Sequence, residues 1–574
     1  MNVLSRPLPA CVTRDRLTSP YWPNLSATGL NTLVALGIVF LLTSLHRLNG
    51  TDLWGHLNFG RWIVTQGALP AVDPFAAQPS GIPVLHTAWL SQVLGYLLAQ
   101  AAGQEGLVLV HALLVTLTAA VLMRAAVLRG VPGRWAWTAG IAMWLLDLPV
   151  VGTIRPQLFG QLGAALCLLA ISELPQRRWA LLWLPVVGAC WANLHGSILM
   201  GLAILGVHAA AATWDAWQAE RHALAAARKN WDAWAAVLLF LAGGCFNPHG
   251  PSVWWHTARF GQHVALASIS EWRPLSPRSL TGVLVLISAG LALWAARRSL
   301  RRWETREVLL LVLFGLATLP AIRMLAWWAL VWPWAVLPHL VAMLVARRDE
   351  PAPQHDAVPP ASATAPVVRL ALPEAEPADE GPTAMRMLIA VGFLFFVFVV
   401  APPTYSVLAG ASRGEGQVLV KMTPIYLADE MVRRGLAGTL AAPLDWADYL
   451  VWKSEGRLRP MVYSHVHLTD EATWRDYEHV FRAEAGWDAV LRQRGIRYLA
   501  VARSRYPQLA RAVLLADRES RHGVRVIYQD QDAILAELAP RAATPPPAEL
   551  PSDPQTPADA PPTAEATPTA PLTQ

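Results

Sequence analysis

The chain has 574 residues, of which 54% are hydrophobic and only 15% charged, with 27 tryptophans and a formal net charge of +6. Soluble domains carry about 25% charged residues, so a chain this long and this apolar needs lipid as part of its solvent. The basic residues are scattered in short loops rather than gathered in one patch, which argues against nucleic-acid binding. The four cysteines have no CxxC spacing, which argues against a zinc knuckle or a disulfide framework.

The N-terminal segment, residues 1–29, carries Arg6, Arg14 and Arg16 and no cleavage site after a short apolar core. We therefore expect the first apolar run to be a retained helix and not a signal peptide. A span needs about 17–25 apolar residues. About eleven spans are predicted, near residues 30–47, 106–127, 135–152, 156–174, 179–192, 196–214, 231–247, 280–296, 307–322, 324–345 and 386–402. The run at 179–192 is short, and a tight re-entrant turn around 191–196 is its alternative.

The distribution of basic residues gives the predicted orientation. With the N-terminus in the cytoplasm, the inner segments before residue 387 hold 20 Lys and Arg residues and the outer segments hold 7. Cytoplasmic loops of membrane proteins are enriched in these residues. We expect a multi-pass protein of a bacterial cytoplasmic membrane, with a cytoplasmic N-terminus and an extracytoplasmic C-terminus.

Two segments do not have the pattern of a span. Within the predicted outer loop 48–105, residues 86–102 place an apolar stripe beside polar positions, which is typical of a helix lying in the membrane interface. The stripe consists of Trp89, Leu90, Val93, Leu94, Leu97 and Leu98. Residues 346–385 are rich in Pro, Ala and acidic side chains and are predicted to be a disordered cytoplasmic linker.

After the last span, residues 403–540 have the pattern of a small α/β domain. Strands are predicted at 461–464 and 497–501, helices at 471–493 and 505–514, and a hairpin of 524–529 with 533–538 around Asp530-Gln531-Asp532. Alternate spacing puts His465 and His467 on one strand face, and edge-strand solubility is the preferred explanation for them. Residues 541–574 are rich in Pro, Ala and Thr and are predicted to be disordered.

Candidate catalytic residues lie in the first outer loop. Asp52 and His56 are neighbours on one face if 52–64 is helical, and a carboxylate at the outer end of the first span is placed to accept a proton from a hydroxyl. Capping of that helix by Asp52 is the alternative. Asp73 precedes Pro74 in a turn-like pair and is a second catalytic candidate, while His86 is a supporting one. Asp52, His56 and Asp73 offer the mixed ligands that would suit a divalent cation, without a known metal spacing.

Further candidates lie at the outer ends of other spans. Arg155 and Arg323 are predicted to bind a phosphate, because guanidinium groups match its geometry; snorkelling to the interface is the alternative. Arg61 is a third phosphate-binding candidate. Supporting candidates are Asn193, His195 and His249, for which hydrogen bonding to backbone where helices break is the alternative. No P-loop, GxSxG or HExxH motif occurs in a suitable context.

These motifs resemble the bacterial GT-C-type membrane glycosyltransferases. The resemblance covers roughly residues 30–345, with 403–540 as an appended domain. It is carried by five short motifs: Asp52-Leu53-Trp54-x-His56 with Gly60-Arg61 and Gly67, Asp73-Pro74-Phe75, His86-x-x-Trp89-Leu90, Arg155-Pro156-Gln157, and Trp191-Ala192-Asn193-Leu194-His195-Gly196. It implies a predominantly α-helical, GT-C-like fold with a bilayer-embedded site that opens outward.

The resemblance also implies a reaction. The donor would be a polyprenyl-phosphate-linked sugar, and the acceptor an extracytoplasmic glycan, lipid or protein. Asp52 matches the acidic position of the first outer loop, whereas Leu53 stands where relatives usually have a Glu. Asp52 would then act as general base, and Arg155 and Arg323 would hold the donor phosphate. The alternatives are a lipid-linked glycan transporter or flippase, and a non-catalytic membrane scaffold.

Overall fold

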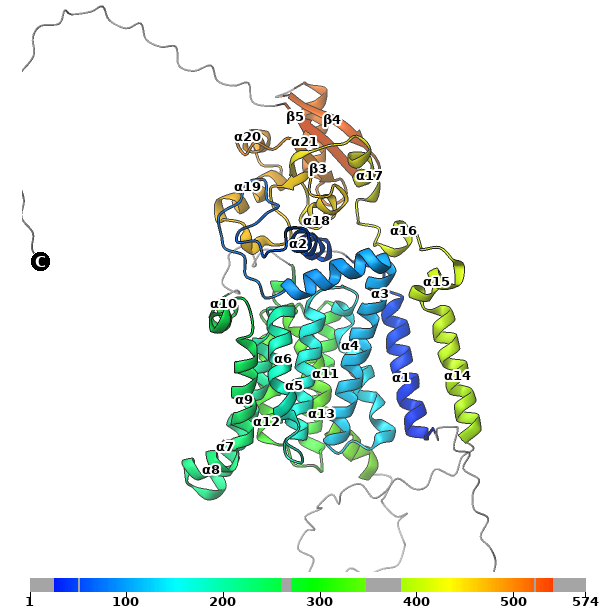
Figure 1. Ribbon diagram of the computed structural model, residues 1–574, viewed down its shortest axis with the longest axis vertical. Helices are drawn as coiled ribbons and strands as arrows, with labels where there is room; N and C mark the ends of the chain where they lie inside the picture. The colour runs from blue at the N-terminus through cyan, green and yellow to red at the C-terminus, as the bar shows by residue number, and fades with distance from the viewer. Residues whose placement is uncertain (1–24, 50–51, 260–269, 347–382, 521–522, 540–574) are drawn as a thin grey trace, which may run out of the picture.

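The computed structural model describes residues 25–49, 52–259, 270–346, 383–520 and 523–539. Most of the N-terminal segment, most of the 346–385 linker and the tail at 541–574 lie outside the described residues. The structure is predominantly helical, with one small sheet near the C-terminus (Figure 1). The helices at the predicted span positions are α1 (Ala27–Ser44), α3 (Trp89–Leu128), α4 (Trp137–Val151), α5 (Gln157–Glu173), α6 (Ala180–Leu194), α7 (Leu199–Glu220), α9 (Trp231–Gly244), α11 (Leu280–Arg298), α12 (Thr305–Thr318), α13 (Leu325–Ala346) and α14 (Thr383–Val400).

Not all of these helices are long enough to cross a bilayer by themselves. In the described part of the chain, five apolar helices pass that test: α1, α3, α7, α11 and the segment Ile322–Val345. A sixth is added if α14 and α15 (Pro402–Ala409), which are bent by 79°, form one span. The remaining five, α4, α5, α6, α9 and α12, have 14–17 residues. The chain is therefore a polytopic membrane protein, with fewer full-length spans than the predicted eleven.

A glycine turns α3 from one direction into another. Gly103 has φ 60° and ψ −155°, a conformation open essentially only to glycine. The part of α3 before Gly103 lies across the end of the bundle, and the part after it runs along the bundle (Figure 1). These two parts correspond to the predicted interfacial helix at 86–102 and the predicted span at 106–127.

The C-terminal domain is built on a five-stranded sheet in the order β2-β1-β3-β5-β4. The strands are β1 (Gly438–Ala441), β2 (Leu458–Pro460), β3 (Tyr498–Ala502), β4 (Val524–Gln529) and β5 (Ala533–Leu538). The parallel partners of β1 are β2 and β3, whereas β5 pairs antiparallel with β3 and β4. The predicted hairpin is confirmed, and the Asp530 carboxylate accepts the backbone N–H groups of Asp532 and Ala533 in its turn. The helices are α16 (Glu415–Val418), α17 (Ile425–Arg433), α18 (Leu444–Lys453), α19 (Glu471–Phe481), α20 (Trp487–Gln493) and α21 (Pro507–Arg518).

Two predictions for this domain were wrong. The strand predicted at 461–464 lies earlier, at β2, because the apolar residues Met461–Tyr463 are buried in irregular backbone after the strand ends. The single helix predicted at 471–493 is two helices, α19 and α20. The chain breaks between them where Ala483 and Gly486 adopt positive φ angles of 55° and 83°, which no continuing right-handed helix can accommodate.

The sheet domain and the first outer loop share one hydrophobic core. Helix α2 (Leu53–Gln66) buries Trp54 and Leu57 against the domain, and the Trp54 ring contacts the rings of Tyr449 and Trp452 on α18 at 5.1 and 5.8 Å. The Asn58 side-chain amide donates to the Asp448 carbonyl at 3.0 Å. On its other side α2 touches α3 so closely that a Cβ at Gly60 would lie 2.0 Å from the Gln92 carbonyl oxygen. The domain is thus held over one end of the bundle (Figure 1).

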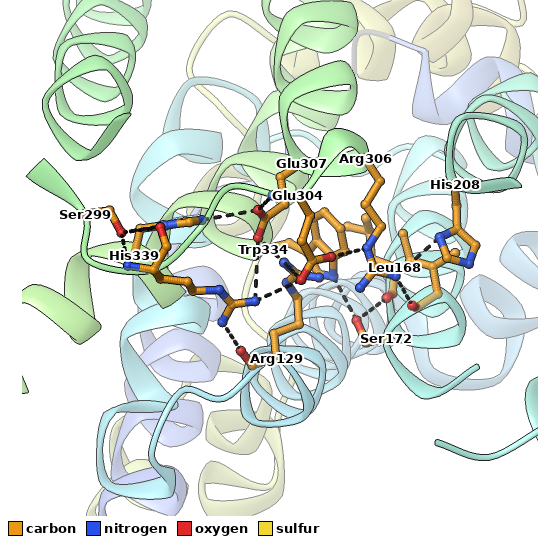
Figure 2. A network of polar contacts seen from close by, with 12 residues as sticks. Arg129, Leu168, Ser172, His208, Ser299, Glu304, Arg306, Glu307, Trp334 and His339 are labelled. Atoms are coloured by element: carbon orange, nitrogen blue, oxygen red, sulfur yellow. Dashed lines mark hydrogen bonds and ion pairs between the residues drawn. The ribbon is translucent and has the colours of Figure 1, made fainter. Parts of the chain in front are cut away.

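A buried polar network ties helices together at the other end of the bundle (Figure 2). Arg129, at the end of α3, forms an ion pair with Glu307 in the first turn of α12, and the two side chains are 1% and 0% exposed. His339 of α13 joins it with Nε2 3.3 Å from Glu307 and Nδ1 2.7 Å from the Ser299 hydroxyl. Buried charges persist only when they are paired in this way, so the network fixes how the end of α3 and the start of α12 meet α13.

Candidate functional site

A cavity of about 660 Å³ lies between the end of the bundle and the C-terminal domain. Its size is typical of small-molecule sites. Three parts of the chain line it. Asp52 and His56 come from the start of α2, and Arg155, His195 and Arg323 come from the connections and helix ends on that side of the bundle. The sheet domain contributes Asp445, Ser464, His465, His467 and Arg505.

Arg155 is the centre of the charged half of the cavity. It lies in the short connection between α4 and α5, where its Nε is 2.9 Å from the Asp52 carboxylate. Its Nη1 contacts the carboxylate of Glu271 in the turn Ser270–Trp272. Asp52 precedes α2 without making a side-chain capping bond, because its carboxylate is turned to Arg155. The predicted pair of Asp52 and Arg155 is therefore brought into contact.

Arg323 lies beside this trio. It belongs to the turn Ile322–Met324 before α13, and its guanidinium lies 5.5 Å from the centre of the Trp272 ring. It lines the same cavity as Arg155 and Glu271. Two arginines and two carboxylates thus meet at one wall.

Buried imidazoles also line the cavity. Desolvation lowers the pKa of His56 to about 3, with the positive charge of Arg155 as the next cause. Desolvation likewise holds the pKa of His465 well below its usual range. The two rings are 5.0 Å apart, and His56 Nδ1 is 3.2 Å from the Gln92 side-chain amide. The preferred explanation of His465 as a solvent-facing edge-strand residue was wrong: it precedes a 3-10 turn, Val466–Leu468, and is only 8% exposed.

Two of the predicted site residues lie outside the cavity lining and make other contacts. Asp73 is 4% exposed, and its carboxylate accepts the backbone N–H groups of Phe75 and Ala76 at 2.8 and 3.2 Å. Burial raises its pKa. Arg61 donates to the carbonyls of Trp452 and Val451 at the end of α18. Neither is among the residues that line the cavity, so the structure does not bring them to Asp52.

The supporting candidates divide in the same way. His86 and His195 line the cavity, with His195 Nδ1 2.6 Å from the Ser197 hydroxyl. Asn193 and His249 instead join chain segments: Asn193 accepts from the Trp89 indole at 2.6 Å, and the His249 ring accepts the His86 backbone N–H at 2.9 Å. These bonds fix where α3 begins relative to α6 and to the segment after α9, which sets one edge of the cavity.

The predicted ligands for a divalent cation are separated in this arrangement. Within the described ranges, no group of three or more His, Cys, Asp or Glu side chains has a geometry that could hold a metal ion. The carboxylates of Asp52 and Glu271 meet on Arg155, and Asp73 is engaged in its own turn. Asp52, His56 and Asp73 therefore do not form a metal site in the described part of the chain.

Sequence reasoning did not select Glu271 or His465 for the site. Glu271 belongs to the outer-side segment Glu271-Trp272-Arg273-Pro274. Its position at the outer end of a predicted span is the feature that could have indicated a site residue. His465 carried no such signal, since its contact with His56 joins residues about 400 positions apart and depends on how the domain docks.

No family model and no curated protein matches the sequence. Among solved structures, the arabinofuranosyltransferase AftD from Mycobacteria matches with a TM-score of 0.50 and 19% identity, over 90% of this chain and 40% of AftD. This chain thus spans less than half of AftD.

Two further structures match with lower scores. The apo oligosaccharyltransferase of Archaeoglobus fulgidus has a TM-score of 0.47 and 12% identity, over 82% of this chain and 69% of that one. ArnT from Cupriavidus metallidurans bound to undecaprenyl phosphate has a TM-score of 0.42 and 15% identity, over 89% and 98%. The match to AftD over most of the chain confirms the predicted fold class. The chain therefore has the fold of the GT-C-type membrane glycosyltransferases.

Proposed function

We propose that this chain is a membrane glycosyltransferase that moves a sugar from a polyprenyl-phosphate donor to an acceptor hydroxyl. The observation that carries the proposal is the cluster of Asp52, Arg155, Glu271 and Arg323 in one cavity at the end of a membrane bundle. Transfer from a lipid phosphate needs a base for the acceptor, cations for the leaving phosphate and access from the bilayer. The cluster supplies the first two, and its place at the end of the apolar bundle supplies the third.

Asp52 is the proposed general base. As the acceptor oxygen forms its bond to the anomeric carbon, its proton passes to the Asp52 carboxylate, and the bond from that carbon to the phosphate oxygen breaks. A carboxylate within hydrogen-bond reach of the acceptor is required for this role. The side chain of Asp52 is 29% exposed, so an acceptor can reach it from the cavity.

Arg323 and Arg155 are the proposed phosphate ligands. The leaving phosphate gains negative charge as the glycosidic bond breaks, and fixed guanidinium groups stabilise that charge more in the transition state than in the ground state. Arg155 is already paired with two carboxylates, so Arg323 is the guanidinium to which the phosphate binds first. Glu271 and Asp52 hold the Arg155 fork in place from two sides, which fixes its direction in advance.

The location follows from the predicted orientation. We propose that the cavity faces the extracytoplasmic side of a bacterial cytoplasmic membrane, where the sheet domain covers it. The part of α3 before Gly103 lies across the bundle end (Figure 1) and would lie in the interface, where a polyprenyl chain enters from the lipid.

Two assays in proteoliposomes test the function. The first measures transfer of radiolabelled sugar from a panel of polyprenyl-phosphate sugars, and the second measures binding of a sugar-free polyprenyl phosphate. Arg323→Gln should weaken binding of the lipid phosphate at least tenfold, while Arg278→Gln, an exposed arginine on the same predicted side, serves as the matched control. Label that crosses the membrane without forming a new bond would indicate a transporter. Equal binding by both variants would contradict the assigned phosphate site.

A further inference from the structure

Helices α6 and α9 pack side by side, with polar contacts at both ends. Where they begin, Arg178 Nε lies 3.5 Å from the Asp232 carboxylate. Where they end, the Asn247 side-chain amide donates to the Asn193 side-chain oxygen at 3.3 Å. The helices have 15 and 14 residues, which makes them about 22 and 21 Å long. The hydrocarbon core of a typical bilayer is about 30 Å thick. Since tilting only lowers the height of a helix, this pair is too short for a bilayer of ordinary thickness.

The outer surface of the pair is apolar and exposed. Leu182 and Val186 on α6 are 68% and 60% exposed, and Leu238 on α9 is 64% exposed. Cys190, near the end of α6, is exposed as well. In a polytopic membrane protein, acyl chains are the solvent around such side chains. Lipid therefore contacts the short helices along most of their length.

Stacked arginine–tryptophan pairs mark both ends of this surface. Where α6 and α9 begin, the Arg178 guanidinium lies 4.8 Å from the centre of the Trp231 ring. At the other end, in helix α10 (Val253–Arg259), the Arg259 guanidinium lies 3.9 Å from the centre of the Trp255 ring. Helix α10 lies beside the end of α9 (Figure 1). Because tryptophan is enriched at membrane–water interfaces, the two pairs mark interfaces that are separated by about the length of α9.

The side of the bundle that carries α14 is taller. Helix α14 has 18 residues, which corresponds to about 27 Å. Its middle is also apolar and exposed, with Val391 at 58% and Phe395 at 67%. Helices α9 and α14 lie on opposite sides of the bundle (Figure 1). The chain thus presents two sides of different hydrophobic height to the lipid.

A short span is accommodated by local thinning of the bilayer, by flanking side chains that reach to the interface, or by oligomerisation. Arg178 and Arg259 are folded onto indole rings, so they add little to the height of the span. We propose that the bilayer is thinned beside α6 and α9, and that this wall binds acyl chains of reduced height. The thinned side adjoins the cavity, because the His249 ring after α9 accepts the backbone N–H of His86 in the cavity lining. The proposal does not depend on the proposed function.

Spin labels on the full chain in dioleoyl phosphatidylcholine vesicles test the thinning without requiring turnover. Collision rates with oxygen and with a water-soluble nickel chelate give the depth of each label. The native cysteines are replaced by alanine, and labels are placed at three exposed positions on each helix. The single-cysteine variants are Trp234→Cys, Leu238→Cys and Ala242→Cys on α9, and Leu388→Cys, Val391→Cys and Phe395→Cys on α14. Labels at residues 182, 186 and 190 of α6 repeat the scan if an α9 variant fails to fold.

The deepest label on α9 should lie about 3–4 Å nearer to an interface than the deepest label on α14, because half of each hydrophobic height limits the depth. The labels on either side of the deepest α9 position should be shallower. An α9 label as deep as the deepest α14 label would overturn the proposal, since the short helix would then sit off-centre in a bilayer of full thickness. Loss of oxygen collisions along α9 and α6 would overturn it as well, because a second copy of the chain would then cover the wall.

Discussion

Replacing Asp52 by Asn removes the proposed base while keeping its shape. A positioned general base contributes about 10²–10⁴-fold to a rate, which corresponds to roughly 3–5 kcal/mol of the barrier. The free energy of unfolding should fall by far less than this. Arg155 keeps its contact with Glu271, the Asp52 side chain is 29% exposed, and a partly exposed ion pair contributes about 1 kcal/mol or less.

The assay is transfer of radiolabelled sugar in proteoliposomes, with thermal unfolding measured on the same preparations. We expect Asp52→Asn to reduce turnover at least a hundredfold and to shift Tm only slightly. Asp429→Asn is the control, since Asp429 is exposed and pairs with Lys453 outside the cavity. Turnover of Asp52→Asn within about threefold of wild type, in folded protein, would refute the assignment of the base.

Further substitutions test the site and its supports. Glu271→Gln removes one of the two carboxylates on Arg155 and should reduce turnover by roughly tenfold or more. Binding of the lipid phosphate by Arg323 should stay normal. Turnover equal to that of the wild type would contradict a role of Glu271 in holding Arg155. Glu307→Gln leaves Arg129 without its buried charge partner and should lower the free energy of unfolding by about 3–5 kcal/mol. Thermal unfolding measures this loss, and an unchanged Tm would contradict a stabilising role of the network in Figure 2. Gly60→Ala places a Cβ against the Gln92 backbone and should destabilise the protein by about 1–3 kcal/mol, unlike Gly206→Ala in α7, where the added Cβ meets no neighbouring side chain or segment. Desolvation holds the pKa of Asp448 well above its usual range, so the folded state retains a proton that the unfolded state releases. The stabilising contribution of Asp448 is therefore complete below the unfolded pKa of about 3.9 and falls as pH rises toward the folded pKa. Asp448→Asn should make Tm depend less on pH above about 3.9. The same dependence of Tm on pH in wild type and variant would argue against a protonated Asp448.

The sequence was informative where a single segment determines the outcome. Apolar runs placed the bundle helices, and Asp52 and Arg155 were both selected because each lies at the outer end of a span. Length was less predictable: α9 and α12 end after 14 residues, since tertiary contacts and not hydropathy alone decide where a helix stops.

The remainder depended on packing between distant segments. Asp73 and Arg61 lie in the first outer loop and have side chains suited to catalysis and phosphate binding. However, Asp73 accepts a backbone N–H in its own turn, and Arg61 donates to a carbonyl at the end of α18. Conversely, His465 is in the cavity because α2 docks against the sheet domain. No pattern in the sequence around His465 predicts this contact between distant segments.

The core shared by α2 and α18 has a consequence for the order in which the chain folds. Asn58 and Asp448, bonded in the native state, are 390 residues apart, and bacterial and eukaryotic synthesis proceeds at about 5–20 residues per second. The apolar face of α2, including Trp54 and Leu57, is therefore made about 20–80 s before its partner exists. During that interval it must rest on α3 or on the membrane surface, so the cavity can close only after the sheet domain has been translated and has folded.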